Sequence, residues 1–172
     1  MTIYFIRHGE PDYSFIKEDD NCQWANLAPL SGCGIEQAIE LKLFEDLKDG
    51  IIISSPYTRA LQTASILANG KNILIEPKLY EWLPSKNFSI KIKEIPYANK
   101  EFKNNTQNCN YETKEEMINR MNYIIDKYRK YDKIIIVAHS RLISTYLQSI
   151  GINKKYLNYC EIFKLEKASS NF

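Results

Sequence analysis

The chain has 172 residues, of which 44% are hydrophobic and 26% are charged. This composition is typical of an ordinary globular domain and excludes a disordered chain. The formal net charge of +2 is too small to indicate a nucleic-acid or membrane-surface partner, and no apolar stretch approaches the roughly 20 residues that a membrane span needs. We therefore expect one domain over residues 1–172, with neither nucleic acid nor membrane among its partners.

The start of the chain and its cysteines bear on compartment and metal content. The first residues are an apolar run that is broken at Arg7 and His8, without the basic and long apolar regions of a signal peptide. We therefore expect a cytoplasmic protein. The four cysteines form no C-x-x-C pair and the chain has only two histidines, which argues against a zinc site and leads us to expect no metal.

The first element in chain order is a strand over residues 1–6 (MTIYFI) that stops at Arg7, His8, Gly9 and Glu10. Its apolar, β-branched and aromatic residues show no helical period, which is typical of a buried strand. Ligands of open α/β sheets bind in the crevice outside the carboxyl ends of the strands. These four residues are therefore the first candidates for a functional site.

Strands and helices alternate after a polar, irregular segment over residues 11–29. The hydrophobic pattern predicts a helix over about 35–44, with Ser31 as its N-cap. A strand over 51–56, a helix over 58–67 that Gly70 ends, and a short strand over 73–75 follow.

The second half of the chain begins with a polar segment of weak periodicity, residues 82–112, which we interpret as a cap insertion with one short helix. Thr113 and Glu116 have the spacing of a capping box that opens a helix to about Tyr128. A clear strand over 133–138 ends at His139, and a helix over 142–150 and an edge strand over 159–165 complete the chain. Within this half, the methionines at 117 and 121 are expected in the core, and the many tyrosines are expected to pack.

This order of elements predicts the α/β class. Strands that alternate with helices across short loops form a mostly parallel sheet with helices on both faces. We expect a three-layer α/β/α sandwich with a mostly parallel central sheet and a small cap insertion over about 82–112.

The two histidines and two arginines share a position relative to the predicted strands. His8 and His139 each follow a strongly apolar strand, and Arg59 lies just after the strand over 51–56. The carboxyl ends of neighbouring parallel strands meet at one rim of the sheet, so these residues and Arg7 are expected together. Arginine forks match phosphate or carboxylate oxygens, and neutral imidazole is a nucleophile or base. The residues alone thus indicate a phosphate site with a histidine nucleophile.

Longer motifs around these residues resemble a known family. RHGE at 7–10, SPYTRALQTA at 55–64 and VAH at 137–139 are similar to motifs of the histidine phosphatase superfamily, the phosphoglycerate mutase-like group. LSGCGIEQA at 30–38 is similar to the family's segment after the first loop. These motifs occur in the family's order, so the resemblance spans residues 7–139.

The resemblance implies catalytic roles for five residues. His8 would attack phosphorus and become phosphohistidine, while Arg7, Arg59 and His139 would hold the phosphoryl oxygens. Glu81 matches the position of the family's usual proton donor. The implied activity is that of a metal-independent phosphomonoesterase without a cofactor. Its partner would be a phosphorylated small molecule, and a phosphoprotein stays open.

Four further residues are expected at the substrate. Gly9 has no side chain and would let its backbone come close to the substrate. Glu10 would orient the loop that carries His8. Ser140 stands where the family commonly has glycine and would offer its backbone N–H to the phosphate. Arg141 either reaches the substrate or pairs with a surface carboxylate.

The same residues leave alternative functions open. A phosphoglycerate or sugar-phosphate mutase would share the fold, and a non-catalytic module would bind phosphorylated ligands in the same pocket. The short insertion favours a phosphatase, because a mutase must retain and re-dock its intermediate. The sequence indicates neither the physiological substrate nor the oligomeric state.

Overall fold

The computed structural model describes residues 1–104 and 108–166, which hold a five-stranded sheet in the order β3-β2-β4-β1-β5. The three pairings among β1, β2, β3 and β4 are parallel, and only β5 runs antiparallel to its neighbour β1. The strands are β1 (Thr2–Arg7), β2 (Ile51–Ser54), β3 (Ile73–Ile75), β4 (Lys133–Ala138) and β5 (Ile162–Glu166). The mostly parallel sheet and its antiparallel edge strand confirm the sequence prediction.

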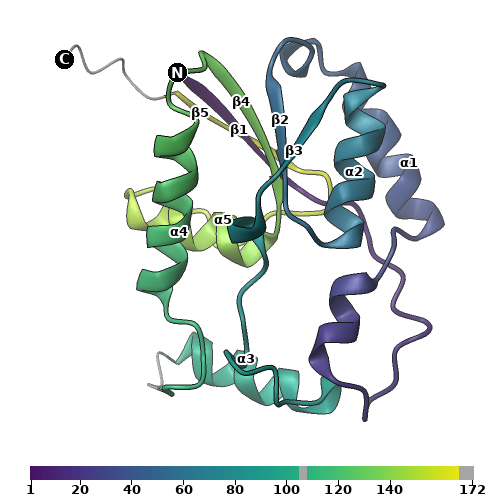
Figure 1. Ribbon diagram of the computed structural model, residues 1–172, viewed down its shortest axis with the longest axis vertical. Coiled ribbons are helices and arrows are strands. Elements are labelled where there is room, and N and C mark those ends of the chain that lie inside the picture. The colour runs from purple at the N-terminus through teal and green to yellow at the C-terminus, as the bar shows by residue number, and fades with distance from the viewer. Residues whose placement is uncertain (105–107, 167–172) are drawn as a thin grey trace.

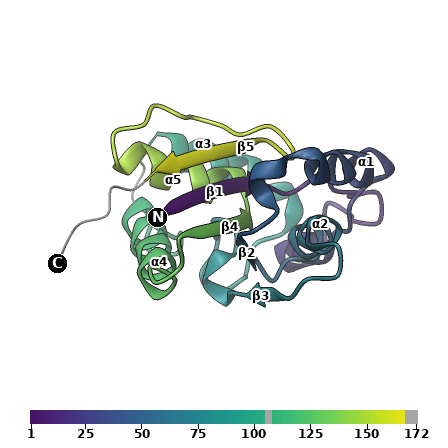
Figure 2. The same cartoon turned by 90° about the horizontal axis from the view of Figure 1, so that it is seen from above.

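Helices cover both faces of this sheet. Figure 2 shows α1 and α2 on one side and α4 and α5 on the other, so the three-layer α/β/α sandwich is confirmed. In Figure 1, α3 lies apart from both layers, beyond the carboxyl ends of the central strands. The helices are α1 (Gly32–Glu40), α2 (Thr58–Ala68), α3 (Ile95–Lys103), α4 (Lys114–Lys127) and α5 (Ser140–Ser149).

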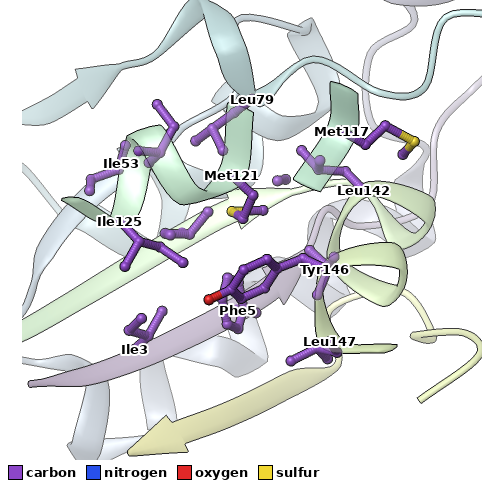
Figure 3. Packing of buried hydrophobic residues seen from close by; sticks show 14 of the residues in the cluster. Ile3, Phe5, Ile53, Leu79, Met117, Met121, Ile125, Leu142, Tyr146 and Leu147 are labelled. Atoms are coloured by element: carbon purple, nitrogen blue, oxygen red, sulfur yellow. The ribbon is translucent and has the colours of Figure 1, made fainter. Parts of the chain in front are cut away.

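Alternate residues of β1 belong to two separate cores. Ile3 and Phe5 pack with α4 and α5, while Tyr4 and Ile6 pack with α2, as the two-residue period of a strand requires. Figure 3 shows Phe5 facing Tyr146 of α5, and their ring centroids are 5.7 Å apart. The two methionines expected in the core, Met117 and Met121, are fully buried there. These cores fix β1 between two helical layers.

The helix expected over 35–44 has different bounds. It begins at Gly32, where Ser31 Oγ accepts a hydrogen bond from Gly34 N (3.0 Å) and confirms the predicted N-cap. It ends at Glu40 and continues as two 3₁₀ turns, Leu41–Leu43 and Glu45–Leu47. The turns bury Leu41 and Leu47, while Leu43 stays 79% exposed. The prediction of a helix to residue 44 was wrong, because the chain winds more tightly after Glu40, in short 3₁₀ turns of three residues each.

The other helix ends follow local chemistry. Thr113 and Glu116 form the predicted capping box, in which each side chain accepts the other residue's backbone N–H. α5 begins at Ser140, two residues earlier than expected, because His139 is its N-cap. α2 ends at Asn69, which adopts a left-handed φ of 48° immediately before Gly70. The second histidine thus stands at the junction of a strand and a helix.

The cap expected over 82–112 contains a 3₁₀ turn (Ile92–Glu94) and α3, and its residues 105–107 lie outside the described part of the chain. Buried Trp82 anchors it: the indole Nε1 donates to Glu112 O (2.8 Å) and the ring lies 4.8 Å from that of Phe102. Arg120 of α4 forms a buried ion pair with Glu112 (2.6 Å). Over residues 1–104 and 108–166, no helix is long and apolar enough to cross a bilayer.

Candidate active site

His8 lies just beyond β1, with only 4% of its surface exposed. Its Nδ1 is 2.7 Å from Gly9 O, and its Nε2 is 3.1 Å from Arg59 Nε. A carbonyl only accepts and a guanidinium only donates. Nδ1 therefore carries the proton, and Nε2 has the lone pair that faces Arg59.

Both histidines are held in the neutral form. Burial lowers the pKa of His8 well below its usual value, and the nearby positive charge of Arg59 lowers it further. The pKa of His139 is lowered well below the usual value by the same two causes, with burial again the larger. Since a charged imidazole is disfavoured by a dry site and by adjacent cations, His8 Nε2 has an unprotonated lone pair at neutral pH.

Arg59, in the first turn of α2, joins the two histidines. Its Nη1 donates to Ala25 O (2.7 Å) and its Nη2 lies 3.4 Å from His139 Nδ1. The guanidinium is buried, with 5% of the residue exposed. Among the described residues, the hydrogen bonds of this buried cation go to two imidazoles and a carbonyl and to no carboxylate, which suits an anionic ligand.

His139 stands opposite His8, with the two ring centroids 5.1 Å apart. It is fully buried, and its Nε2 is 2.8 Å from the hydroxyl oxygen of Ser55, which follows β2. A hydroxyl both donates and accepts, so Ser55 fits either tautomer of His139. The histidine can therefore offer an N–H or a lone pair at Nδ1.

Arg7, the last residue of β1, is held by the segment that precedes β5. Its Nη1 donates to Leu157 O (2.8 Å) and to the Tyr156 hydroxyl, and its guanidinium lies 3.8 Å from the ring centroid of Tyr159. Arg7 Nε is buried and has no hydrogen-bond partner within the described ranges. The expectation that the C-terminal tyrosines only pack was wrong for Tyr156, which is 54% exposed.

The loop that carries His8 is fastened to the start of α1. Gly9 N donates to Thr63 Oγ1 (3.0 Å), and the Glu10 carboxylate accepts from Ser31 Oγ (2.8 Å). A Cβ on Gly9 would lie 2.5 Å from Gly34 O, so the close approach of Gly9 is to α1. The Glu10 carboxylate thus binds the N-cap residue of α1, and its role in orienting the His8 loop stays a prediction.

Ser140 and Arg141 make contacts that the sequence did not indicate. Ser140 Oγ accepts from Leu157 N (2.9 Å), which positions the Leu157 carbonyl that binds Arg7. Arg141 donates to Asn99 Oδ1 (2.8 Å) and its guanidinium lies 4.5 Å from the Trp82 ring centroid. Its hydrogen-bond partner is thus an amide of α3, and no surface carboxylate of the described residues pairs with Arg141 as one of the two expectations had it.

Glu81 is hydrogen-bonded to the start of the cap and to α5. Its Oε1 accepts from Trp82 N (2.8 Å) and from Leu142 N in the first turn of α5 (3.3 Å). It lines a cleft of about 360 Å³ together with Arg7, Arg59 and Arg141. The Glu81 carboxylate also opposes the lowering of the Arg141 pKa by burial. The cleft therefore brings together a carboxylate and three of the expected cations.

Sequence reasoning missed two groups of positioning residues. Ser55 and Thr63 stand within the SPYTRALQTA motif, so their place there was a usable signal. Thr63 Oγ1 bonds both Gly9 N and Arg59 O. Tyr156 and Tyr159 belong to no motif, and only the fold places them at Arg7.

The donor set does not form a metal centre in the part of the chain that is described. No group of three or more histidine, cysteine, aspartate or glutamate side chains in it is arranged to hold an ion.

The profile of the histidine phosphatase superfamily (branch 1) matches residues 3–170. The chain therefore belongs to this superfamily. The motifs that resemble it in the sequence are the segments that meet around His8 and Arg59.

Solved structures of three phosphatases have the same fold. α-Ribazole phosphatase from Shigella flexneri has a TM-score of 0.72 at 21% identity, covering 98% of this chain and 92% of that one. Phosphoserine phosphatase from Entamoeba histolytica, bound to 3-phosphoglyceric acid, has a TM-score of 0.72 at 22% identity, covering 95% and 89%. Mycobacterial glucosyl-3-phosphoglycerate phosphatase, in complex with VO3, has a TM-score of 0.72 at 17% identity, covering 96% and 92%. A search of curated proteins finds no match.

Proposed function

We propose that this protein is a phosphomonoesterase that acts through a phosphohistidine on His8. The observation that carries the proposal is the neutral His8 ring, whose Nδ1–H is tied to Gly9 O and whose Nε2 lone pair faces Arg59. A neutral imidazole approaches a dianionic ester without charge repulsion. It is also a leaving group that water can displace from phosphorus.

The surrounding cations supply the stabilisation that phosphoryl transfer needs. As phosphorus approaches Nε2, its oxygens take over the hydrogen bonds that Arg59 makes to His8 and His139. Arg7 Nε is a buried donor without an acceptor in the described chain, and a phosphoryl oxygen satisfies it. Fixed positive charge around the equatorial oxygens stabilises the transition state.

Glu81 is the proposed general acid. In the first step the bond from His8 Nε2 to phosphorus forms, the bond from phosphorus to the ester oxygen breaks, and Glu81 protonates the departing oxygen. In the second step Glu81 takes a proton from water, whose oxygen attacks phosphorus and releases phosphate and His8. The support for this role is the place of Glu81 in the cleft with Arg7 and Arg59.

The proposed substrate is a phosphorylated small molecule. The cleft is small, about 360 Å³, and the cap residues Trp82, Phe88 and Ile95 line it. The related structures named above are of phosphatases whose names specify phosphoserine, α-ribazole and glucosyl-3-phosphoglycerate. We propose cytoplasmic action without a metal or a cofactor.

Trapping of the intermediate tests this function. Wild-type protein incubated with a ³²P-labelled ester and quenched in alkali should carry an acid-labile label on His8, and His8→Ala should carry none. As a matched control, Tyr123→Phe alters an exposed ring on α4 and should label normally. A turnover rate of His8→Ala close to that of the wild type would contradict the proposal.

The same assay separates the alternatives. A phosphatase releases one inorganic phosphate for each ester consumed, with or without EDTA. A mutase instead returns an isomeric phosphate ester. A binding module shows affinity for vanadate but no label across a panel of esters.

A further inference from the structure

A second cavity of about 940 Å³ adjoins the catalytic cleft. The two share Arg7, Glu81 and Arg141 among their lining residues. We call the second cavity the lysine groove, because Lys103 of α3, Lys114 of α4 and Lys155 of the segment before β5 also line it. Three different segments thus each contribute a lysine to the cavity that Glu81 also lines.

The lysine groove concentrates positive charge that the chain as a whole does not have. The full sequence has 23 lysines and arginines against 21 acidic residues. The residues that line the groove include five cations and a single carboxylate, Glu81. Such a local excess attracts anions and raises their concentration at the site.

Two lysines of the groove, Lys103 and Lys155, form no ion pair with a carboxylate of the described chain. The next lysine along the chain behaves differently, since Lys154 pairs with Glu161. Lys114 lies with its Nζ 5.5 Å from the centroid of the Phe102 ring. Lys103 and Lys155 therefore keep their positive charge available to a ligand in the groove.

One side of the groove is formed by α5, which presents the polar side chains of Ser144, Thr145, Gln148 and Ser149. Phe102, Ile118 and Tyr156 add apolar surface to the lining. The catalytic cleft has no lysine among its described lining residues. Of the two spaces that Glu81 lines, the groove is therefore the one that offers lysines to a charged leaving group.

We propose that the leaving alcohol of the substrate carries a second anionic group, a carboxylate or a phosphate, which the lysines at 103, 114 and 155 bind. This inference rests on the proposed function, because it takes the leaving oxygen to lie beside Glu81. Exposed lysines bind an anion as mobile point charges. They therefore select for charge more than for a fixed shape.

Binding of phosphonates tests the groove without any turnover. Calorimetry compares butylphosphonate, which has one anionic group, with 5-phosphonopentanoate and butane-1,4-bisphosphonate, which have two. For each variant, the affinity of a two-anion ligand is divided by that of butylphosphonate. A weakened phosphate-binding end lowers both affinities alike and therefore leaves this ratio unchanged. We expect the wild type to bind at least one two-anion ligand about tenfold more tightly than butylphosphonate. The carboxylate and bisphosphonate arms distinguish the two anions, and each 0.1 M of added salt should reduce the ratio.

Removal of the lysines should abolish the preference. Each of Lys103→Gln, Lys114→Gln and Lys155→Gln should lower the affinity ratio about threefold at most, and the triple variant should bring it near one. Lys100→Gln is the matched control, because Lys100 lies on α3 but does not line the groove. Circular dichroism verifies that each variant is folded, and the single variants keep the test valid if the triple variant is not.

The outcomes separate this inference from the proposed function. A wild-type ratio near one, or a ratio that the triple variant retains, overturns the groove assignment whatever His8 does. A lysine-dependent ratio in a protein that never forms phosphohistidine overturns the catalytic proposal but keeps the anion site. Loss of the ratio in Lys100→Gln to the same degree as in Lys103→Gln also overturns the assignment.

Discussion

The two ends of the candidate site are built in different ways. At the proposed phosphate end, His8 and His139 are each at most 5% exposed, and both are hydrogen-bonded to the equally buried Arg59. At the proposed leaving-group end, Glu81 and Arg141 are partly exposed, and the lysines of the groove are exposed. One end is thus enclosed and interlocked, while the other is open to solvent.

The difference in burial between the two ends matches a difference in their proposed tasks, which are phosphoryl transfer at the enclosed end and recognition of the leaving alcohol at the open end. The phosphate end is anchored to β1, β2 and β4, whose positions two hydrophobic cores fix. The leaving-group end comes from the cap, the first turns of α5 and the segment before β5. We infer that the transferred group is read by rigid, buried donors and the departing alcohol by adaptable surface charges.

Arg59 gives the largest expected effect and tests whether the phosphate end acts as a unit. Arg59→Ala removes the contacts to His8, His139 and Ala25 together. We expect kcat/KM for any phosphate ester to fall by about 10³-fold or more, since arginines that stabilise a transferring phosphoryl group contribute on that scale. Steady-state phosphate release measures it.

A matched control is Arg129→Ala, which removes an exposed arginine paired with Asp126 and should leave kcat/KM unchanged. A loss below about tenfold in Arg59→Ala would mean that the phosphate end is not interlocked in the way described.

Glu81 tests the boundary between the two ends. Glu81→Gln removes the proton donor but keeps an acceptor for the N–H groups of Trp82 and Leu142. For alkyl phosphates, whose leaving group needs protonation, we expect kcat to fall by about 10²-fold or more. For p-nitrophenyl phosphate, whose leaving group departs as an anion, the fall should be far smaller. Equal losses on both substrates would contradict a role as general acid, and Glu115→Gln on the exposed face of α4 is the control.

Gly34 tests how strictly the His8 loop must pack. A Cβ at Gly34 would lie 2.1 Å from Glu10 O, whereas one at Gly32, two residues earlier, has nothing within 4 Å. We therefore expect Gly34→Ala to destabilise the protein by about 1–3 kcal/mol and to lower kcat by displacing His8. Gly32→Ala, in the same helical turn, should change neither. Urea unfolding and phosphate release measure both, and identical behaviour of the two variants would refute the packing argument.

The phosphate end was largely predictable from sequence because its residues follow strands. His8 and His139 stand directly after apolar strands, Arg59 follows another, and parallel pairing brings strand ends to one rim. The fold was predictable for the same reason, since strand and helix periods are visible in the residues. Local departures from the regular α-helix, such as the 3₁₀ turn after Glu40, were not predictable from this pattern.

The leaving-group end was not predictable because its residues share no period and no motif. Lys103, Lys114 and Lys155 belong to no motif and line one cavity only through the packing of α3, α4 and the segment before β5. Arg141 was identified, but its partner Asn99 lies 42 residues away in the cap. Such contacts depend on tertiary structure, which a single sequence does not reveal.

The smallest expected effect is a dependence of stability on pH that belongs to the phosphate end alone. Because the pKa values of His8 and His139 are lowered in the folded state, the unfolded chain binds more protons below its histidine pKa of about 6.5. The contribution of the two histidines to the free energy of unfolding is thus fully present above that pH and declines as the pH falls.

Between pH 7.5 and 5.5 each histidine that stays neutral in the folded state should lower the free energy of unfolding by about 1.4 kcal/mol. Urea unfolding at both values measures this change, and His8→Gln should remove about half of it because one of the two buried imidazoles is gone. Above pH 5.5 the carboxylates contribute little, so the change reports on the two histidines. The prediction fails if the free energy of unfolding does not vary over this range, or if it varies equally in His8→Gln. Either result would mean that the histidines of the phosphate end are as open to solvent as the leaving-group end.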